Sequence, residues 1–239
     1  MNQVAVSGTL VQKPDLRYTP KGVAVLRLRI GGAVAHEEAT RSHYLDVTLF
    51  GDKAARLADV LDVGATILAV GELTQRQAEG KTYTNLVARS IRAVLSPKVQ
   101  DGLEQGAVNR FTGIGFLADD PEVRVEGRLV RARVAFNSRD KNGETHTVFL
   151  NVDAWEEVGQ ELRRLKKGAQ VYVEGLVRAR AYTAKDGSKR RDVFISARVV
   201  RPLTWASGQS EEVRVVEATV NEDSGSWLSD DEFPEDLPF

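Results

Sequence analysis

Four aromatic residues occupy matched places in two short segments of the chain. Tyr44 and Phe50 lie six residues apart in YLDVTLF, and Phe149 and Trp155 lie six residues apart in FLNVDAW. In both segments apolar and polar residues alternate, which is the period of a strand buried on one face. The rings fall in the polar phase, so each strand is expected to present two rings outward, roughly 20 Å apart. Exposed rings at matched places favour stacking against a flat ligand.

Arginine residues fall in the same outward phase of other strand-like segments. Arg27 and Arg29 do so in the first half of the chain, and Arg131 and Arg133 do so in the second. A later segment adds Arg76 in the first half and a larger set in the second: Arg178, Arg180, Lys185, Lys189, Arg190 and Arg191, beside a fifth ring at Tyr182. Because these cations attract phosphate while rings stack on bases, the combination predicts a groove for single-stranded nucleic acid.

The matched places result from an internal repeat. MNQVAVSGTLVQKPDLRY from Met1 reappears as VNRFTGIGFLADDPEVRV from Val108, at a constant offset of 107 residues. Further on, HYLDVTLFG matches VFLNVDAWE, and VGATILAVGEL matches KGAQVYVEGLV. The chain is therefore expected to hold two copies of one domain, residues 1–95 and 108–203. Residues 96–107 have the composition of a linker.

Each copy is expected to be an all-β barrel with one short helix. About five alternating runs end at glycine, proline or aspartate turns. Apolar residues at helical spacing mark one helix between the third and fourth strands: Ala54, Leu57 or Ala58, and Leu61 in the first copy, and Val158, Leu162 and Leu165 in the second. This order predicts two tandem OB-folds, which are small, partly open Greek-key barrels. A β-sandwich is the alternative, but it requires about seven strands and no helix in that position.

Charge is distributed unevenly along the chain. Residues 206–239 contain ten acidic residues and one arginine, a net charge of −9, and the preceding 205 residues carry 32 Lys and Arg against 24 acidic residues, a net charge of +8. Residues 204–239 are expected to be a disordered acidic tail on a basic body that meets a polyanion. The tail ends in rings among carboxylates, which indicates either a solvated terminus or a peptide ligand for a partner protein.

Several function classes lack candidate residues. The chain has no cysteine, and His36, His43 and His146 do not have metal-ligand spacing, so they are expected in loops or at the rim. No acid/base couple or activated nucleophile stands out, so neither an enzyme nor a bound cofactor is expected. Without a leader or a run of about 18 apolar residues, a cytoplasmic protein with no membrane segment is expected.

Together these segments resemble bacterial single-stranded DNA-binding proteins of the two-OB-fold kind found in the Deinococcus and Thermus group. The resemblance covers both copies and the terminal EDLPF, in which Leu237 replaces the family's usual isoleucine. It implies base stacking on the five rings, phosphate contacts from the arginines and lysines, and a homodimer with four OB-folds. It also implies that the tip binds replication, repair and recombination enzymes at the nucleoid, through Glu235, Asp236, Leu237, Pro238 and Phe239.

Two other functions remain open. An OB-fold reader of RNA would use the same rings and cations. A primosome-type adaptor would instead bury the rings against a partner protein, and the arginines would then be an ordinary solvated surface. Ala78 stands where the second copy has Tyr182, so the first copy is expected to contribute less to the affinity for DNA.

Overall fold

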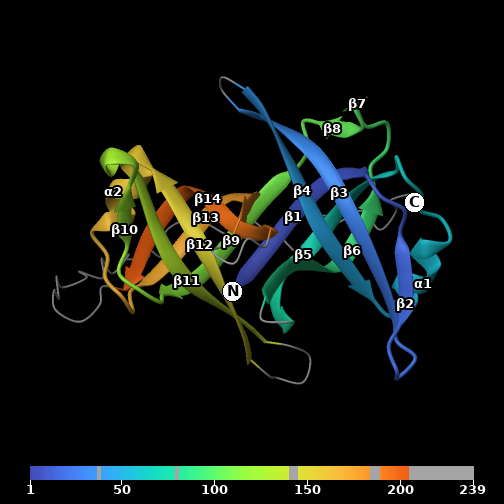
Figure 1. Cartoon of the computed structure of the whole chain (residues 1–239), viewed down its shortest axis with the longest axis horizontal. Helices are drawn as coiled ribbons and strands as arrows, with labels where there is room; N and C mark the ends of the chain where they lie inside the picture. Colours follow the sequence, from blue (N-terminus) through green and yellow to red (C-terminus); the bar gives the residue numbers. More distant parts are fainter. Residues whose placement is uncertain (37–38, 79–80, 140–144, 184–188, 205–239) are drawn as a thin grey trace, which may run out of the picture. The chain divides into compact units, whose positions relative to one another are not determined.

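A computed structural model of the chain describes residues 1–36, 39–78, 81–139, 145–183 and 189–204 (Figure 1). The first copy contains β1 (Asn2–Leu10), β2 (Asp15–Tyr18), β3 (Ala24–His36), β4 (Ala39–Phe50), α1 (Asp52–Ala58), β5 (Thr66–Ala78) and β6 (Lys81–Ala93). The second contains β9 (Asn109–Leu117), β10 (Glu122–Arg124), η1 (Val125–Gly127), β11 (Leu129–Arg139), β12 (Thr145–Trp155), α2 (Glu156–Arg163), β13 (Gln170–Thr183) and β14 (Lys189–Thr204). Between them lie β7 (Val99–Gln100) and β8 (Leu103–Gln105).

Each copy closes into an OB-fold barrel. In the first copy the strands pair in the cyclic order β1, β3, β4, β6, β5 and back to β1. The second copy repeats this order with β9, β11, β12, β14 and β13. In both copies the third and last strands of the barrel pair in parallel and the other pairs are antiparallel. The predicted OB-folds are confirmed, as is the place of each helix between the third and fourth barrel strands. The helices are shorter than the apolar spacing indicated, since they end at Ala58 and Arg163, before Leu61 and Leu165.

Strand alternation places the core as the sequence indicates. In β4, Leu45, Val47 and Leu49 are buried while Tyr44 and Phe50 are exposed. The helices contribute one apolar stripe each, with Ala54 of α1 and Leu162 of α2 fully buried. Because side chains on a strand alternate between its faces, burial of one phase presents the other phase outward.

The two copies join through their first strands. β1 pairs antiparallel with β9, and Val4 opposite Phe111 is the centre of a pseudo-twofold arrangement. The side chains of Asn2 and Asn109 occupy equivalent places, and each makes two hydrogen bonds to backbone, Asn2 at Leu73 and Asn109 at Val177. Strands from both copies therefore form one continuous sheet.

Residues 96–107 form more than a spacer. β7 and β8 make a hairpin, and β8 pairs in parallel with β3, where Glu104 lies opposite Gly32. A Cβ at Gly31 would lie 2.7 Å from Cδ2 of Leu103 and 2.9 Å from Cε1 of Tyr44. Glycine at position 31 thus lets the hairpin and the Tyr44 ring approach the backbone of β3 closely. Composition alone indicated a linker because it does not show such pairing.

His43 is buried in β4, which corrects the expectation of a loop or rim position. Its Nε2 donates a hydrogen bond to the Ser7 carbonyl at 3.0 Å, and among the described residues nothing bonds its Nδ1. The first three barrel strands pack closely here, because a Cβ at Gly32 of β3 would lie 2.8 Å from Cε1 of His43 and 2.9 Å from the carbonyl oxygen of Ser7. In the second copy Val148 takes this place, so the histidine is particular to the first.

Stability is expected to fall in mild acid because of His43. Burial lowers the pKa of His43 below 6.5; the Ser7 hydrogen bond opposes this shift, and the charge of Arg178 adds to it. Below about pH 6.5 the unfolded chain therefore binds a proton at His43 more readily than the folded chain does. The free energy of unfolding has its full value above about pH 6.5 and declines below it, by at most about 1.4 kcal/mol per pH unit. Urea denaturation from pH 7.5 to 5 measures this slope. His43→Gln should remove most of it, and an unchanged slope would contradict the assignment.

A left-handed residue follows the last ring of the third barrel strand in both copies. It is Gly51 at φ 81° in the first copy and Glu156 at φ 49° in the second. Their N–H groups donate to matched carbonyls, those of Ala24 and Arg128. The turn therefore requires a positive φ, which favours glycine.

Glu156→Gly is accordingly expected to leave stability unchanged or to raise it by up to about 1 kcal/mol, because relief of backbone strain offsets the entropy cost of glycine. The ion pair that Glu156 makes with Arg128 is exposed and contributes little. Thermal unfolding of this variant and of Glu157→Gly, one position later in α2, makes the comparison. A loss of about 1 kcal/mol in both variants would show that the turn carries no strain.

Candidate nucleic-acid interface

The four matched rings of β4 and β12 are exposed. Relative exposures are 40% for Tyr44, 48% for Phe50, 40% for Phe149 and 45% for Trp155. Tyr44 and Phe50 project from the outer side of β4, and Phe149 and Trp155 do so from the outer side of β12. Both barrels therefore present two rings on the same strand, outside a closed core.

Two further rings were missed by the sequence analysis. Phe194 of β14 and Tyr83 of β6 lie on the return strand of each copy's long hairpin, in the outward phase. Arginines that the sequence did single out lie over both rings, Arg180 at 4.6 Å from the Phe194 centroid and Arg76 at 5.3 Å from that of Tyr83. The first copy therefore does have a ring on its hairpin, although Ala78 lacks one. No local pattern marks Tyr83, because its pairing with Arg76 follows from the register of the hairpin.

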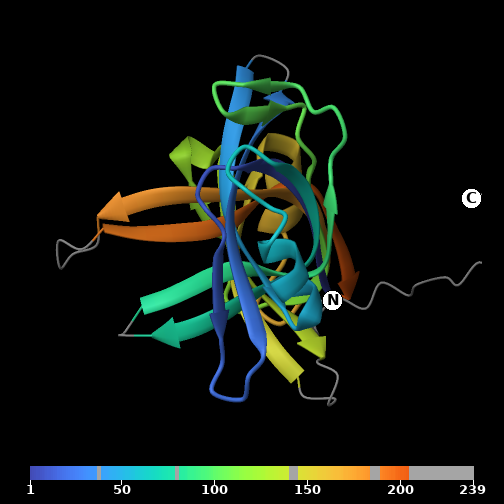
Figure 2. The same cartoon turned by 90° about the vertical axis from the view of Figure 1, so that its right-hand side faces the viewer.

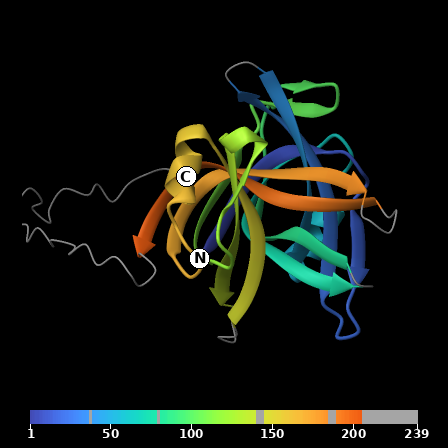
Figure 3. The same ribbon diagram turned by 60° about the vertical axis from the view of Figure 1, so that its left-hand side comes forward.

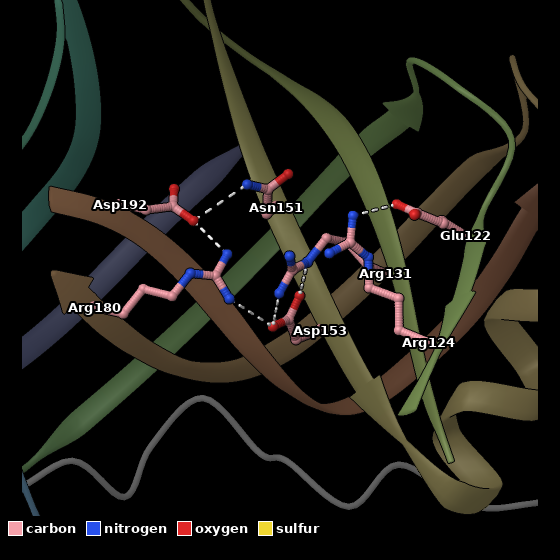
Figure 4. Close-up of polar contacts among 7 residues, drawn as sticks. All are labelled: Glu122, Arg124, Arg131, Asn151, Asp153, Arg180 and Asp192. Carbon is pink, nitrogen blue, oxygen red and sulfur yellow. Dashed lines mark hydrogen bonds and ion pairs between the residues drawn. The ribbon is translucent and has the colours of Figure 1, made fainter. Parts of the chain in front are cut away.

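Carboxylates hold two of the predicted phosphate-binding arginines of the second barrel, Arg131 and Arg180 (Figure 4). Arg131 donates two hydrogen bonds of 2.6 Å to Asp153, whose side chain is only 6% exposed. This hydrogen bond raises the pKa of Arg131, although burial opposes the shift. Arg180 is 3.5 Å from Asp153 and also bonds Asp192. Arg131 is therefore partly neutralised and belongs to the barrel wall as much as to a phosphate site.

Arg133 is placed differently from its neighbour Arg131. Its guanidinium lies 5.0 Å from the centroid of the Phe149 ring, and its side chain is exposed. A guanidinium over one face of a ring can contact a phosphate while a base stacks on the other face, so Arg133 and Phe149 form one unit.

The first barrel arranges its charges in the opposite way. Arg29 lies 3.1 Å from Asp46, whereas Arg27 faces Thr48, the counterpart of Asp153. Within the described residues no ion pair or hydrogen bond engages the exposed Arg27. Each barrel thus has one neutralised and one freer arginine on its second strand, but the two positions are exchanged between the copies.

Arg178 lies in a basic cluster that sequence reasoning saw only in part. Burial lowers the pKa of Arg178, and the charges of Arg41 and Arg198 lower it further. Arg41 comes from β4 of the first copy, while Arg178 and Arg198 come from β13 and β14 of the second. In the described part of the chain no carboxylate pairs with any of the three, so the cluster offers attraction to an anion at the junction of the copies.

The remaining candidates are described only in part or not at all. The backbone of the β13–β14 hairpin places Tyr182 opposite Arg190, and Lys189 opposite Thr183. Lys185 lies outside the described residues, as do Glu235, Asp236, Leu237, Pro238 and Phe239 of the tip and the tail from residue 205. Arg191 bonds to Tyr44 and Asp46 of the first copy.

Other classes of site receive no support from the geometry. Among the described residues, no group of three or more His, Cys, Asp and Glu side chains converges as metal ligands do. Within the same ranges, none of the helices has the length and apolar character needed to cross a bilayer. What both barrels do share is a face of rings and arginines, which defines a tandem OB-fold protein of the nucleic-acid-binding kind.

Comparison with known proteins is consistent with that class. The chain matches the Single-strand binding protein family over residues 1–96 and 108–203, and it belongs to that family. The single-stranded DNA-binding protein of Thermus aquaticus is 32% identical, over 100% of this chain and 98% of the relative. Its counterpart in Deinococcus radiodurans is 26% identical, over 88% of this chain and 78% of the relative. The crystal structure of the wild-type Thermus aquaticus protein matches with a TM-score of 0.69 at 28% identity, covering 88% of this chain and 96% of that one.

Proposed function

We propose that this protein is a non-enzymatic, sequence-tolerant binder of single-stranded DNA that coats and protects the strand during replication, recombination and repair. The observation that carries the proposal is the recurrence, in both barrels, of exposed rings with arginines over or beside them. Membership of the family and the names of its relatives support the same ligand.

Binding is expected to combine two physical terms. Bases stack on Tyr44, Phe50, Phe149 and Trp155, and each stacked base contributes about 1 to 3 kcal/mol. Phosphates contact Arg27, Arg133 and the basic cluster, which makes the affinity depend on salt. Duplex DNA is excluded because paired bases do not expose their faces for stacking. Sequence tolerance follows, since every base has a face.

We also propose a homodimer that presents four OB-folds. Six strands, in the order β14, β13, β9, β1, β5 and β6, form a sheet whose inner face covers the two cores. Its outer face carries apolar side chains that the described residues leave uncovered or half-covered, namely Ala5, Leu68, Val70, Ile114, Phe116 and Tyr172. A second copy of this face would bury them. Sedimentation of the unaltered chain and of Val70→Arg tests this, with a dimer expected for the former and a monomer for the latter.

The acidic tip is proposed to recruit partner enzymes through residues 235–239. A chain lacking these five residues should bind oligo-dT at least as tightly as the full chain, because it loses acidic groups that compete with DNA for the basic body. DNA as ligand would place the protein at the nucleoid, in the cytoplasm.

Fluorescence titration with oligo-dT tests the central proposal. Substitution of Trp205 and Trp227 by phenylalanine leaves Trp155 as the only tryptophan, so quenching then reports stacking on the outer face of β12. Strong quenching by oligo-dT that is largely retained in salt is expected, with little change on adding duplex DNA.

The rival functions predict different titrations. An RNA reader would be quenched by oligo-U at least as strongly as by oligo-dT. A primosome-type adaptor would leave Trp155 indifferent to both oligonucleotides. Either result would contradict the proposed ligand.

A further inference from the structure

The outer edge of each third barrel strand is unpaired at its stacking ring. β12 pairs with β14 only from Asn151 to Ala154, and β4 pairs with β6 only at Val47 and Thr48. Phe149 and Tyr44, the matched rings of the two copies, lie before these pairings begin. Their backbone groups on that edge therefore have no strand partner within their own barrel.

The other copy supplies the missing partner at Phe149. Gln75 of β5 accepts a hydrogen bond from the Phe149 N–H at 3.0 Å and donates one to the Phe149 carbonyl at 2.8 Å. The same amide nitrogen donates to the Thr84 hydroxyl of β6 at 3.2 Å. These three bonds fix the orientation of the Gln75 amide. The amide pairs with the backbone N–H and carbonyl of Phe149 as a residue of a neighbouring strand would.

Arg191 makes the equivalent contact from the second copy to the backbone of the first. From β14 of the second copy it donates to the Tyr44 carbonyl and, at 3.0 Å, to Asp46 of the first copy. Asp46 also accepts from Arg29 at 3.1 Å, so it joins an arginine from each copy. These bonds hold the guanidinium in place, and the Arg191 side chain is only 27% exposed. Burial lowers the pKa of Arg191, and the Asp46 charge opposes that shift.

The two long hairpins that carry these residues reach across the junction. Figure 2 shows the β5–β6 and β13–β14 hairpins extending toward the same side, and Figure 3 shows β13–β14 running toward the strands of the first barrel. Each hairpin thus leaves its own barrel and contacts the ring-bearing strand of the other. Sequence separation gives no hint of this, since the contacts join residues 74 and 147 positions apart.

We propose that Gln75 and Arg191 are positioning residues that lock the two ring-and-arginine faces into one track, so that a single DNA strand binds both copies as one ligand. This rests on the proposed function. Gln75 holds the Phe149 backbone and Arg191 the Tyr44 backbone, and neither is required to touch DNA. Arg191, which the sequence analysis assigned to phosphate, is reassigned to this clamp. Without these contacts each face still binds DNA, but once one face is occupied the other face is held less closely along the same strand. Its effective concentration for that strand therefore falls.

Oligonucleotide length separates this role from a direct contact. Binding is measured for oligo-dT of about 8 nucleotides, within the range that one OB-fold occupies, and of about 30 nucleotides, which spans both copies. Gln75→Met keeps the size of the side chain and removes its hydrogen bonds. Arg191→Lys keeps the charge and loses the fork that bonds both Asp46 and the Tyr44 carbonyl. Gln160→Ala and Arg163→Lys, exposed on α2, are the matched controls.

Both clamp variants should weaken binding of the long oligonucleotide at least about fivefold and that of the short one less than twofold. The controls should change neither. Equal losses at both lengths, or no loss at the longer one, would overturn the proposal. If the unaltered protein binds neither length, the proposed function itself fails. If it binds both and the variants leave the ratio of the two affinities unchanged, only the clamp is wrong.

Discussion

Trp155→Leu and Phe149→Leu are each expected to lower the affinity for oligo-dT by about 1 to 3 kcal/mol, or roughly 5- to 150-fold. Leucine keeps an apolar side chain of moderate size on β12 but has no flat face on which a base can stack. Both rings are exposed and lie outside the core, so the barrel itself should remain folded. Isothermal titration with unlabelled oligo-dT measures the change without relying on tryptophan.

Salt dependence separates stacking from charge in these variants. Because neither ring contacts phosphate, the slope of log K against log salt should match that of the unaltered protein, whereas loss of a phosphate contact such as Arg27 lowers the slope by about 1. Tyr18→Leu, an exposed ring on β2 outside both the proposed DNA face and the proposed dimer face, is the matched control and should leave affinity unchanged. Equal effects of Tyr18→Leu and Trp155→Leu would place the DNA elsewhere.

The barrels and the direction of these rings could be predicted because both follow from burial of one strand phase. Leu45, Val47 and Leu49 can be buried together only if Tyr44 and Phe50 face away, and the repeat shows the same pattern in the second copy. Alternation is a local property, so one sequence is enough to find it. The helices follow from the same local reasoning.

The residue that faces each outward side chain from the neighbouring strand could not be predicted. Arg131 meets Asp153 and Arg27 meets Thr48 because of the register between neighbouring strands, which no local period determines. The ring of Tyr83 escaped notice for the same reason, since its partner Arg76 lies on the other strand of the hairpin. The Gln75 contact to Phe149 depends in addition on how two barrels pack. Residue types therefore indicate a binding face, while register decides which of its charges remain free.

The register between β11 and β12 has its largest expected effect at Asp153, which lies opposite Arg131. Its carboxylate is almost fully buried on the outer wall of the second barrel, between Arg131 and Arg180. Removal of one partner from a buried pair leaves an uncompensated charge, which typically costs about 3 to 5 kcal/mol. Asp153→Asn keeps the shape of the side chain, so the loss measures charge and hydrogen bonding rather than a cavity.

Asp153→Asn is therefore expected to lower the free energy of unfolding by about 3 kcal/mol, as measured by urea denaturation at pH 7.5. Glu122→Gln is the matched control: it breaks the exposed pair with Arg124 and should change stability by less than about 1 kcal/mol. Similar stability of the two variants would show that the Arg131 pair is no more than a surface ion pair.

The same substitution should strengthen DNA binding while it weakens the fold. Arg131 and Arg180 lose their shared carboxylate and become available to phosphate, as Arg27 already is in the first barrel, where Thr48 takes the place of Asp153. At a temperature where Asp153→Asn remains folded, its affinity for oligo-dT at low salt should rise and the slope of log K against log salt should steepen by about 1 for each arginine that gains a phosphate.

Opposite signs of the effects on stability and on affinity would identify Asp153 as a residue that maintains the barrel wall at the expense of positive charge on the binding face. A fall in affinity together with stability would instead mean that Asp153 orients its arginines toward the DNA, and the second barrel would then bind through the ordered network of Figure 4 rather than through free cations.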